Sequence, residues 1–156
     1  MENTTAELAQ IVNNFSARLN TLADVEFTAK PDPQKWSKQE VLGHLVDSAQ
    51  NNLRRFIVGQ YQSTPPKIVY DQDFWVKANA YQNMKKEDVI MLWKFINERI
   101  IDVLNTMPPE NHARLCDTGK DTVQLHTIEW LASDYVRHMK HHLNQIFPES
   151  FDVVYV

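Results

Sequence analysis

The sequence has little glycine or cysteine, no long apolar run and no excess of basic residues, and these shortages restrict its fold and function. Only three glycines, Gly43, Gly59 and Gly119, occur in 156 residues. An all-β sandwich or a doubly wound α/β fold needs more tight turns and glycine-rich loops than that. With 43% hydrophobic and 23% charged residues, the composition is typical of an ordered globular chain. We therefore predict a mostly helical fold and one domain, residues 1–156.

The charge balance and the lack of a membrane-length apolar run bear on partners and location. The formal net charge is −4, and the chain has no basic cluster of the kind that nucleic acids and anionic lipids favour. No stretch approaches the roughly 20 apolar residues that cross a bilayer, and the polar start does not resemble a secretory signal. We expect a cytoplasmic protein that binds neither nucleic acid nor membrane. The single cysteine, Cys116, cannot form an internal disulfide, and we interpret it as an incidental thiol in a loop.

Apolar residues recur at three- and four-residue intervals in four long segments, which is the spacing of amphipathic helices. The predicted helices run approximately over Thr5–Ala23, from Ser37 until Gly59, over Lys86–Met107, and from near Thr127 to a point before Pro148. Ser37 and Glu40 have the spacing of a capping box at the start of the second helix. A short extra helix is predicted to begin near Asp71, in the connection between the second and third helices. A polar loop is expected between the third and fourth helices, so the economical architecture is a four-helix bundle.

Six histidines occur in the chain, and three of them form a candidate metal site. His138 and His142 are four residues apart on the fourth predicted helix, so their imidazoles share one face, and that face carries the apolar stripe. His44 lies on the inward side of the second helix and is the third candidate. Imidazoles bind Zn, Ni, Fe or Mn, and three ligands leave an open position, as catalytic sites do. Histidines that only pack and form hydrogen bonds in the core are the alternative, and the residues alone leave it open.

Asp47 and the three remaining histidines are the other polar residues that bear on this site. Asp47 lies one turn after His44 and could orient a ligand or accept a proton; alternatively it only pairs with an arginine such as Arg137. His141 points about 100° away from its neighbour His142, so we interpret it as a surface residue or a support for a ligand. His112 and His126 lie in loop or helix-start positions without a clear partner.

Two segments resemble the signature helices of the DinB-like superfamily. They are Trp36–Ser48 (WSKQEVLGHLVDS) and Asp134–Ile146 (DYVRHMKHHLNQI), and the resemblance extends over nearly the whole chain. It implies a four-helix bundle in up-down-down-up order. It also implies a divalent metal held by one histidine of the second helix and an H-x-x-x-H pair of the last helix. At the matching positions of this sequence these are His44, His138 and His142.

The resemblance implies an enzyme without fixing its reaction. Members of the family include transferases and isomerases that use a low-molecular-weight thiol such as bacillithiol, mycothiol or glutathione, and others are labelled metal-dependent hydrolases. Either chemistry would use the metal as a Lewis acid toward a thiol or a water, and the fold does not decide between them. A small-molecule substrate and a homodimer are expected. The alternative function is a non-catalytic binding or stress-response bundle whose histidines are structural.

Overall fold

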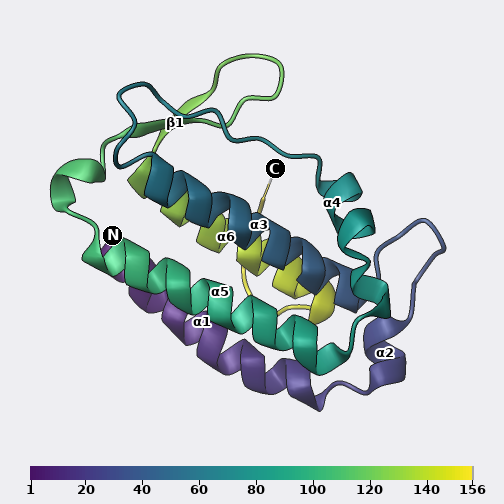
Figure 1. Ribbon diagram of the computed structural model, residues 1–156. Helices are drawn as coiled ribbons and strands as arrows, with labels where there is room; N and C mark the ends of the chain where they lie inside the picture. Colours follow the sequence, from purple (N-terminus) through teal and green to yellow (C-terminus); the bar gives the residue numbers. More distant parts are fainter. Residues whose placement is uncertain (156) are drawn as a thin grey trace.

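The computed structural model describes residues 1–155 and contains four long helices (Figure 1). They are α1 (Glu2–Thr21), α3 (Lys38–Val58), α5 (Lys86–Thr106) and α6 (Ile128–Ile146). Helices α1 and α6 run in one direction and α3 and α5 in the other (Figure 1), which confirms the predicted up-down-down-up bundle. Both α1 and α3 pack against α5 and against α6, so the apolar stripes of all four meet in a common core. No helix within residues 1–155 is long and apolar enough to span a bilayer.

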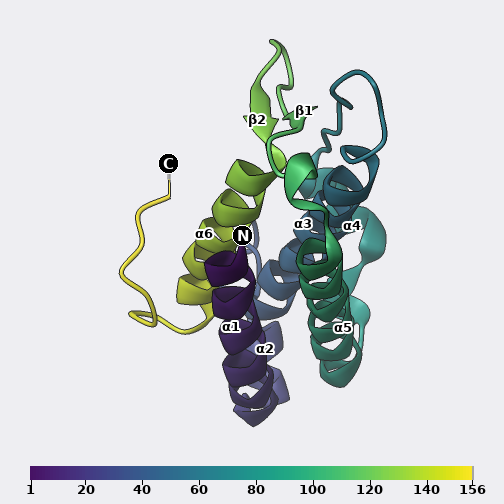
Figure 2. The ribbon, with the colours of Figure 1, turned by 90° about the vertical axis from the view of Figure 1, so that its left-hand side faces the viewer.

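Short elements connect and cover the ends of the bundle. They are α2 (Asp24–Thr28), α4 (Gln72–Asn79), the 3₁₀ turns η1 (Tyr81–Asn83) and η2 (Pro109–Asn111), and the strands β1 (Leu115–Asp117) and β2 (Leu125–Thr127). The strands pair antiparallel, and this hairpin projects from the end of the bundle where α6 begins (Figure 2). The extra helix expected near Asp71 is present as α4. The polar loop expected before the fourth helix was a partial error, because part of it forms the hairpin, and α2 was not predicted.

Hydrogen bonds from side chains fix where the site-bearing helices begin. The Ser37 hydroxyl accepts from the backbone N–H of Glu40, and the Glu40 carboxylate accepts from the backbone N–H of Ser37, which confirms the predicted capping box of α3. The Thr127 hydroxyl likewise accepts from the backbone N–H of Trp130 at the start of α6. These bonds satisfy N–H groups that have no partner within the helix. They therefore set the position from which α3 and α6 place their histidines.

Cys116 does not lie in a loop as predicted. It lies in β1 and is fully buried, with its thiol donating to the backbone carbonyl of Arg55 at 3.7 Å. Burial raises the pKa of this thiol, so a smaller fraction of it is present as the reactive thiolate. Cys116 is therefore a core residue that joins the hairpin to α3 rather than an incidental thiol in a loop.

Candidate metal centre

The structure brings His44 of α3 together with His138 and His142 of α6. One ring nitrogen from each lies within 4.8 Å of the others, and the Nε2 atoms of His44 and His138 are 3.2 Å apart. His44 is fully buried, whereas the two α6 histidines are half-buried. Their predicted place on the face that carries the apolar stripe would bury both imidazoles, and this burial is only partial. They lie at the edge of the apolar stripe, where a bound ion could still be reached from outside.

The spacing of the nitrogens fits a metal ion. Zinc–imidazole bonds are about 2.0–2.1 Å long, so two nitrogens on a tetrahedral ion lie ~3.3 Å apart. The 3.2 Å separation of the His44 and His138 nitrogens matches that value. All three ligand atoms come from neutral-nitrogen donors, which also suit nickel, iron and manganese. The donor set therefore fits a divalent transition metal.

Two side chains hold the α6 imidazoles in a ligand-ready orientation. The Gln145 carbonyl oxygen accepts a hydrogen bond from Nδ1 of His142 at 3.1 Å, which leaves Nε2 of that ring with a lone pair for a ligand bond. The Gln145 amide in turn lies 3.3 Å from Nε2 of His141. The Ser48 hydroxyl lies 3.4 Å from Nδ1 of His138. His141 thus contacts the residue that orients a candidate ligand, and it is not itself part of the cluster.

The protonation states favour metal binding at neutral pH. Burial, reinforced by the neighbouring imidazole of His142, lowers the pKa of His44 to about 3 and that of His138 to about 2. Burial also lowers the pKa of His142 to about 4. All three rings are therefore neutral at pH 7, and the neutral imidazole is the form that binds a metal.

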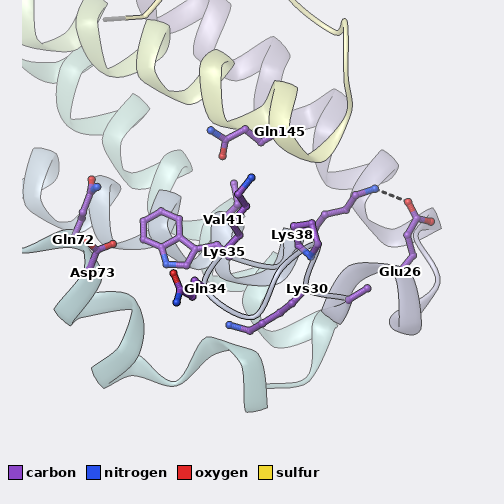
Figure 3. A pocket seen from close by; sticks show the side chains of 12 residues that line it. Glu26, Lys30, Gln34, Lys35, Lys38, Val41, Gln72, Asp73 and Gln145 are labelled. Carbon is purple, nitrogen blue, oxygen red and sulfur yellow. Dashed lines mark hydrogen bonds and ion pairs between the residues drawn. The ribbon is translucent and has the colours of Figure 1, made fainter.

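Two cavities lie near the cluster. His138 and Ser48 line a polar cavity of about 430 Å³ between α3, α6, the hairpin and the C-terminal tail. A larger cavity of about 760 Å³ is lined by Trp36 and Gln145, among others, and Figure 3 shows the Gln145 side chain projecting from α6 beside it. The Trp36 ring packs against the His44 ring, with centroids 5.0 Å apart. Among residues 1–155 no histidine lines the larger cavity, so the smaller one gives the direct approach to the cluster.

Asp47 is fully buried, but within residues 1–155 its hydrogen-bond partners do not include the histidines. Its Oδ1 atom accepts from the Tyr81 hydroxyl at 2.6 Å and from the Asn79 amide at 2.9 Å. Within residues 1–155 its Oδ2 atom has no partner, and Arg137 pairs with Asp134 instead. The Arg137 pairing considered for Asp47 is therefore wrong. Asp47 ties α3 to α4 and η1 one turn from His44.

We predict that Asp47→Asn stabilises the metal-free protein at neutral pH. Burial raises the pKa of Asp47 from 3.8 to about 6, against the opposing hydrogen bonds from Tyr81 and Asn79. The folded state thus holds the proton more tightly than the unfolded chain, and stability present below pH 4 is lost as the pH rises through about 6. The neutral amide avoids that loss, which by pKa arithmetic is roughly 2–3 kcal/mol. Urea unfolding should show the gain at pH 7.5 and none at pH 4. If the variant and the wild type differ in stability equally at both pH values, the raised pKa of Asp47 is not the cause of the difference.

The remaining histidines lie outside the cluster. His126 is in β2 and stacks on Trp130, with ring centroids 3.8 Å apart, and His112 caps the η2 turn. Sequence reasoning missed Ser48 and Gln145. Helical spacing could have found both, since Ser48 is four residues after His44 and Gln145 is three residues after His142.

Sequence comparisons place these residues in a known family context. The model of the DinB superfamily matches residues 7–146. YfiT of Bacillus subtilis (strain 168), a candidate metal-dependent hydrolase, is 25% identical over 141 residues, covering 88% of this chain and 79% of YfiT. A candidate metal-dependent hydrolase of Geobacillus thermodenitrificans (strain NG80-2) is 24% identical over 143 residues, covering 90% of this chain and 79% of the relative.

Solved structures share the bundle. The structure of YfiT from Bacillus subtilis, described as a probable metal-dependent hydrolase with an unusual four-helix bundle topology, superposes with a TM-score of 0.83 at 21% identity. The match covers 93% of this chain and 82% of YfiT. A mycothiol-dependent maleylpyruvate isomerase superposes with a TM-score of 0.70 at 11% identity, over 91% of this chain and 59% of the isomerase. These likenesses establish the fold.

Proposed function

The chain belongs to the DinB superfamily, and from that premise we propose that it is a metal-dependent enzyme that acts on a small molecule. His44, His138 and His142 would hold a divalent ion. The observation that carries the proposal is the convergence of three neutral imidazoles within 4.8 Å, one of which, His138, lines a polar cavity of about 430 Å³. Cavities of this size accommodate small-molecule ligands. Three protein ligands also leave room at the metal for a substrate or nucleophile.

The chain's own residues would orient the ligands and contact the substrate. When bound, a divalent ion would act as a Lewis acid that lowers the pKa of a water or a thiol. Ser48 and Gln145 fix the imidazole rings, and the full burial of His44 keeps bulk water from that side of the cluster. In the polar cavity, burial and the neighbouring Asp134 raise the pKa of Tyr155 to about 12. Its hydroxyl therefore keeps its proton at neutral pH, donates it to Asp134 at 3.2 Å, and has lone pairs that can accept a hydrogen bond from a substrate.

Two nucleophiles are compatible with this site. Water is supported by the names of the two sequence relatives, which are candidate metal-dependent hydrolases. A low-molecular-weight thiol is supported by the structural likeness to a mycothiol-dependent isomerase, and would make the protein a thiol-dependent transferase. The metal can be Zn, Ni, Fe or Mn, because imidazole accepts all four.

The reaction class is tested with the metal-reconstituted protein. One arm offers ester and amide substrates, and the other offers an electrophile with glutathione, bacillithiol or mycothiol. We expect turnover in one arm that falls at least about 100-fold after chelation or in His138→Ala, because loss of a ligand should cost at least as much as loss of a residue that orients one. Turnover without added thiol identifies a hydrolase, and strict thiol dependence identifies a transferase. Turnover that survives chelation and the substitution would contradict a metal-dependent enzyme.

The non-catalytic alternative predicts a different result. If His44, His138 and His142 only pack, replacing all three with glutamine would leave every assayable property of the protein unchanged. The expected homodimer and cytoplasmic location stay predictions.

A further inference from the structure

The polar cavity beside His138 is also lined by Arg55, which is half-buried. Arg55 lies on the same face of α3 as Ser48, the residue that contacts the His138 ring. Ser48, Asn52 and Arg55 line the cavity from α3, at positions that follow one another along one face of a helix. Arg55 comes seven positions after Ser48, which corresponds to about 10 Å of helical rise. The cavity therefore has the histidine cluster near one end and a guanidinium group near the other.

The hydrogen bonds of Arg55 fix its position without neutralising it. Its Nε and Nη2 atoms donate to the backbone carbonyl of Ile68 at 3.1 and 2.6 Å, and Nη1 donates to Asn52 Oδ1 at 3.2 Å. A guanidinium has five N–H groups, so these three bonds leave two for a ligand. Both acceptors, the Ile68 carbonyl and the Asn52 side-chain oxygen, are uncharged. Within residues 1–155 no carboxylate lies at ion-pair distance from Arg55.

The other charges of the cavity are already paired. Asp134 accepts from Arg137 at 2.7 Å and from the Tyr155 hydroxyl at 3.2 Å. The lining therefore contains two guanidinium groups and one carboxylate among its ionised side chains, because Tyr70 and Tyr155 both have a raised pKa and stay neutral. Among the described residues that line the cavity, Arg55 is the guanidinium without a carboxylate partner. A partly desolvated cation without a counter-ion favours an anionic ligand.

We propose that the molecule processed at this site carries a carboxylate or similar oxyanion, which Arg55 binds while the reacting end lies at His138. This inference rests on the proposed function, since it names the substrate class of the same site. The anion could belong to the substrate itself or to a thiol co-substrate that also carries a carboxylate. In both cases the planar guanidinium supplies its two remaining N–H groups to the oxygens.

The test measures binding to metal-free protein by calorimetry at constant ionic strength. The probes are succinate and its neutral isostere succinamide. Succinate is expected to bind at least tenfold more tightly than succinamide. Arg55→Gln should weaken succinate binding at least tenfold, whereas Arg54→Gln, which removes an exposed charge from the adjacent position, should change it less than twofold. Lys35→Gln, in the larger cavity, should also have little effect.

Two results overturn the proposal. One is equal binding, or no binding, of the two probes by the wild-type protein, and this decides the question even if Arg55→Gln does not fold. The other is loss of succinate binding in Lys35→Gln or Arg54→Gln but not in Arg55→Gln. Glutathione distinguishes the sources of the anion, because an Arg55-dependent affinity above that of succinate assigns it to a thiol co-substrate. Since no metal is present, failure of metal binding leaves this result unaffected, and the two proposals fail separately.

Discussion

Replacing His138 with alanine is expected to lower the affinity of the protein for Zn²⁺ or Ni²⁺ by at least about 100-fold. The substitution removes one of three nitrogens that lie within 4.8 Å of one another, and two imidazoles on separate helices hold an ion much less firmly than three. Metal at 100 times its dissociation constant should stabilise the wild-type protein by about 2.7 kcal/mol. That corresponds to a rise in Tm of roughly 5–10 °C for a chain of this size. The variant should show almost no rise at the same metal concentration.

The measurement uses protein purified without a nickel column and stripped with a chelator before titration. His112→Gln is the matched control, because it removes an imidazole that lies outside the cluster, and its Tm should rise as in the wild type. The metal-free His138→Ala protein should remain folded, since His138 is only half-buried and its ring packs at the edge of the core. An equal rise in Tm in wild type and His138→Ala would mean that the metal binds elsewhere, and would remove the basis of the proposed function.

The four helices and the histidine pair could be predicted because both depend on local spacing. Apolar residues at three- and four-residue intervals define a helix face wherever the rest of the chain lies. The same rule places His138 and His142 one turn apart. The Ser37 capping box is local as well, and it is present as predicted. The pairing of His44 with the α6 histidines is not local, and it came from the family resemblance together with the inward position of His44 on its helix.

The features that sequence reasoning missed depend on contacts between distant segments. Each strand of the β1–β2 hairpin is three residues long, which is too short for an alternating pattern of apolar and polar residues to be visible. The burial of Cys116 follows from the packing of that hairpin on the end of α3. Arg137 is a possible partner of Asp47 by charge alone, but the actual partner, Tyr81, is 34 residues away and lies in a 3₁₀ turn that the sequence does not reveal. The two free N–H groups of Arg55 likewise could not be predicted, because its other N–H groups bond mainly to the backbone carbonyl of Ile68, which lies outside α3.

The close approach of Tyr81 to α3 leads to the second large prediction, which concerns Gly43. We expect Gly43→Ala to destabilise the protein by roughly 3 kcal/mol, although alanine is favoured over glycine in a helix by about 1 kcal/mol. A Cβ atom at this position would lie 2.8 Å from Cε2 of Tyr81 and closer still to two other ring carbons. The ring is buried and cannot move aside freely. Displacing it costs about 1–3 kcal/mol of overpacking, and weakening its bond to Asp47 adds a comparable amount.

A double-mutant cycle separates this clash from a general effect on the helix. In a Tyr81→Ala background the ring is absent, so Gly43→Ala should be neutral or stabilising by up to about 1 kcal/mol. Urea unfolding of the four proteins gives the coupling energy directly. If Gly43→Ala costs the same with and without the Tyr81 ring, the close approach is not the reason for the glycine. If the cycle shows the expected coupling, the glycine before His44 is required because it lets Tyr81 reach Asp47 across the face of α3, one turn from the candidate metal centre.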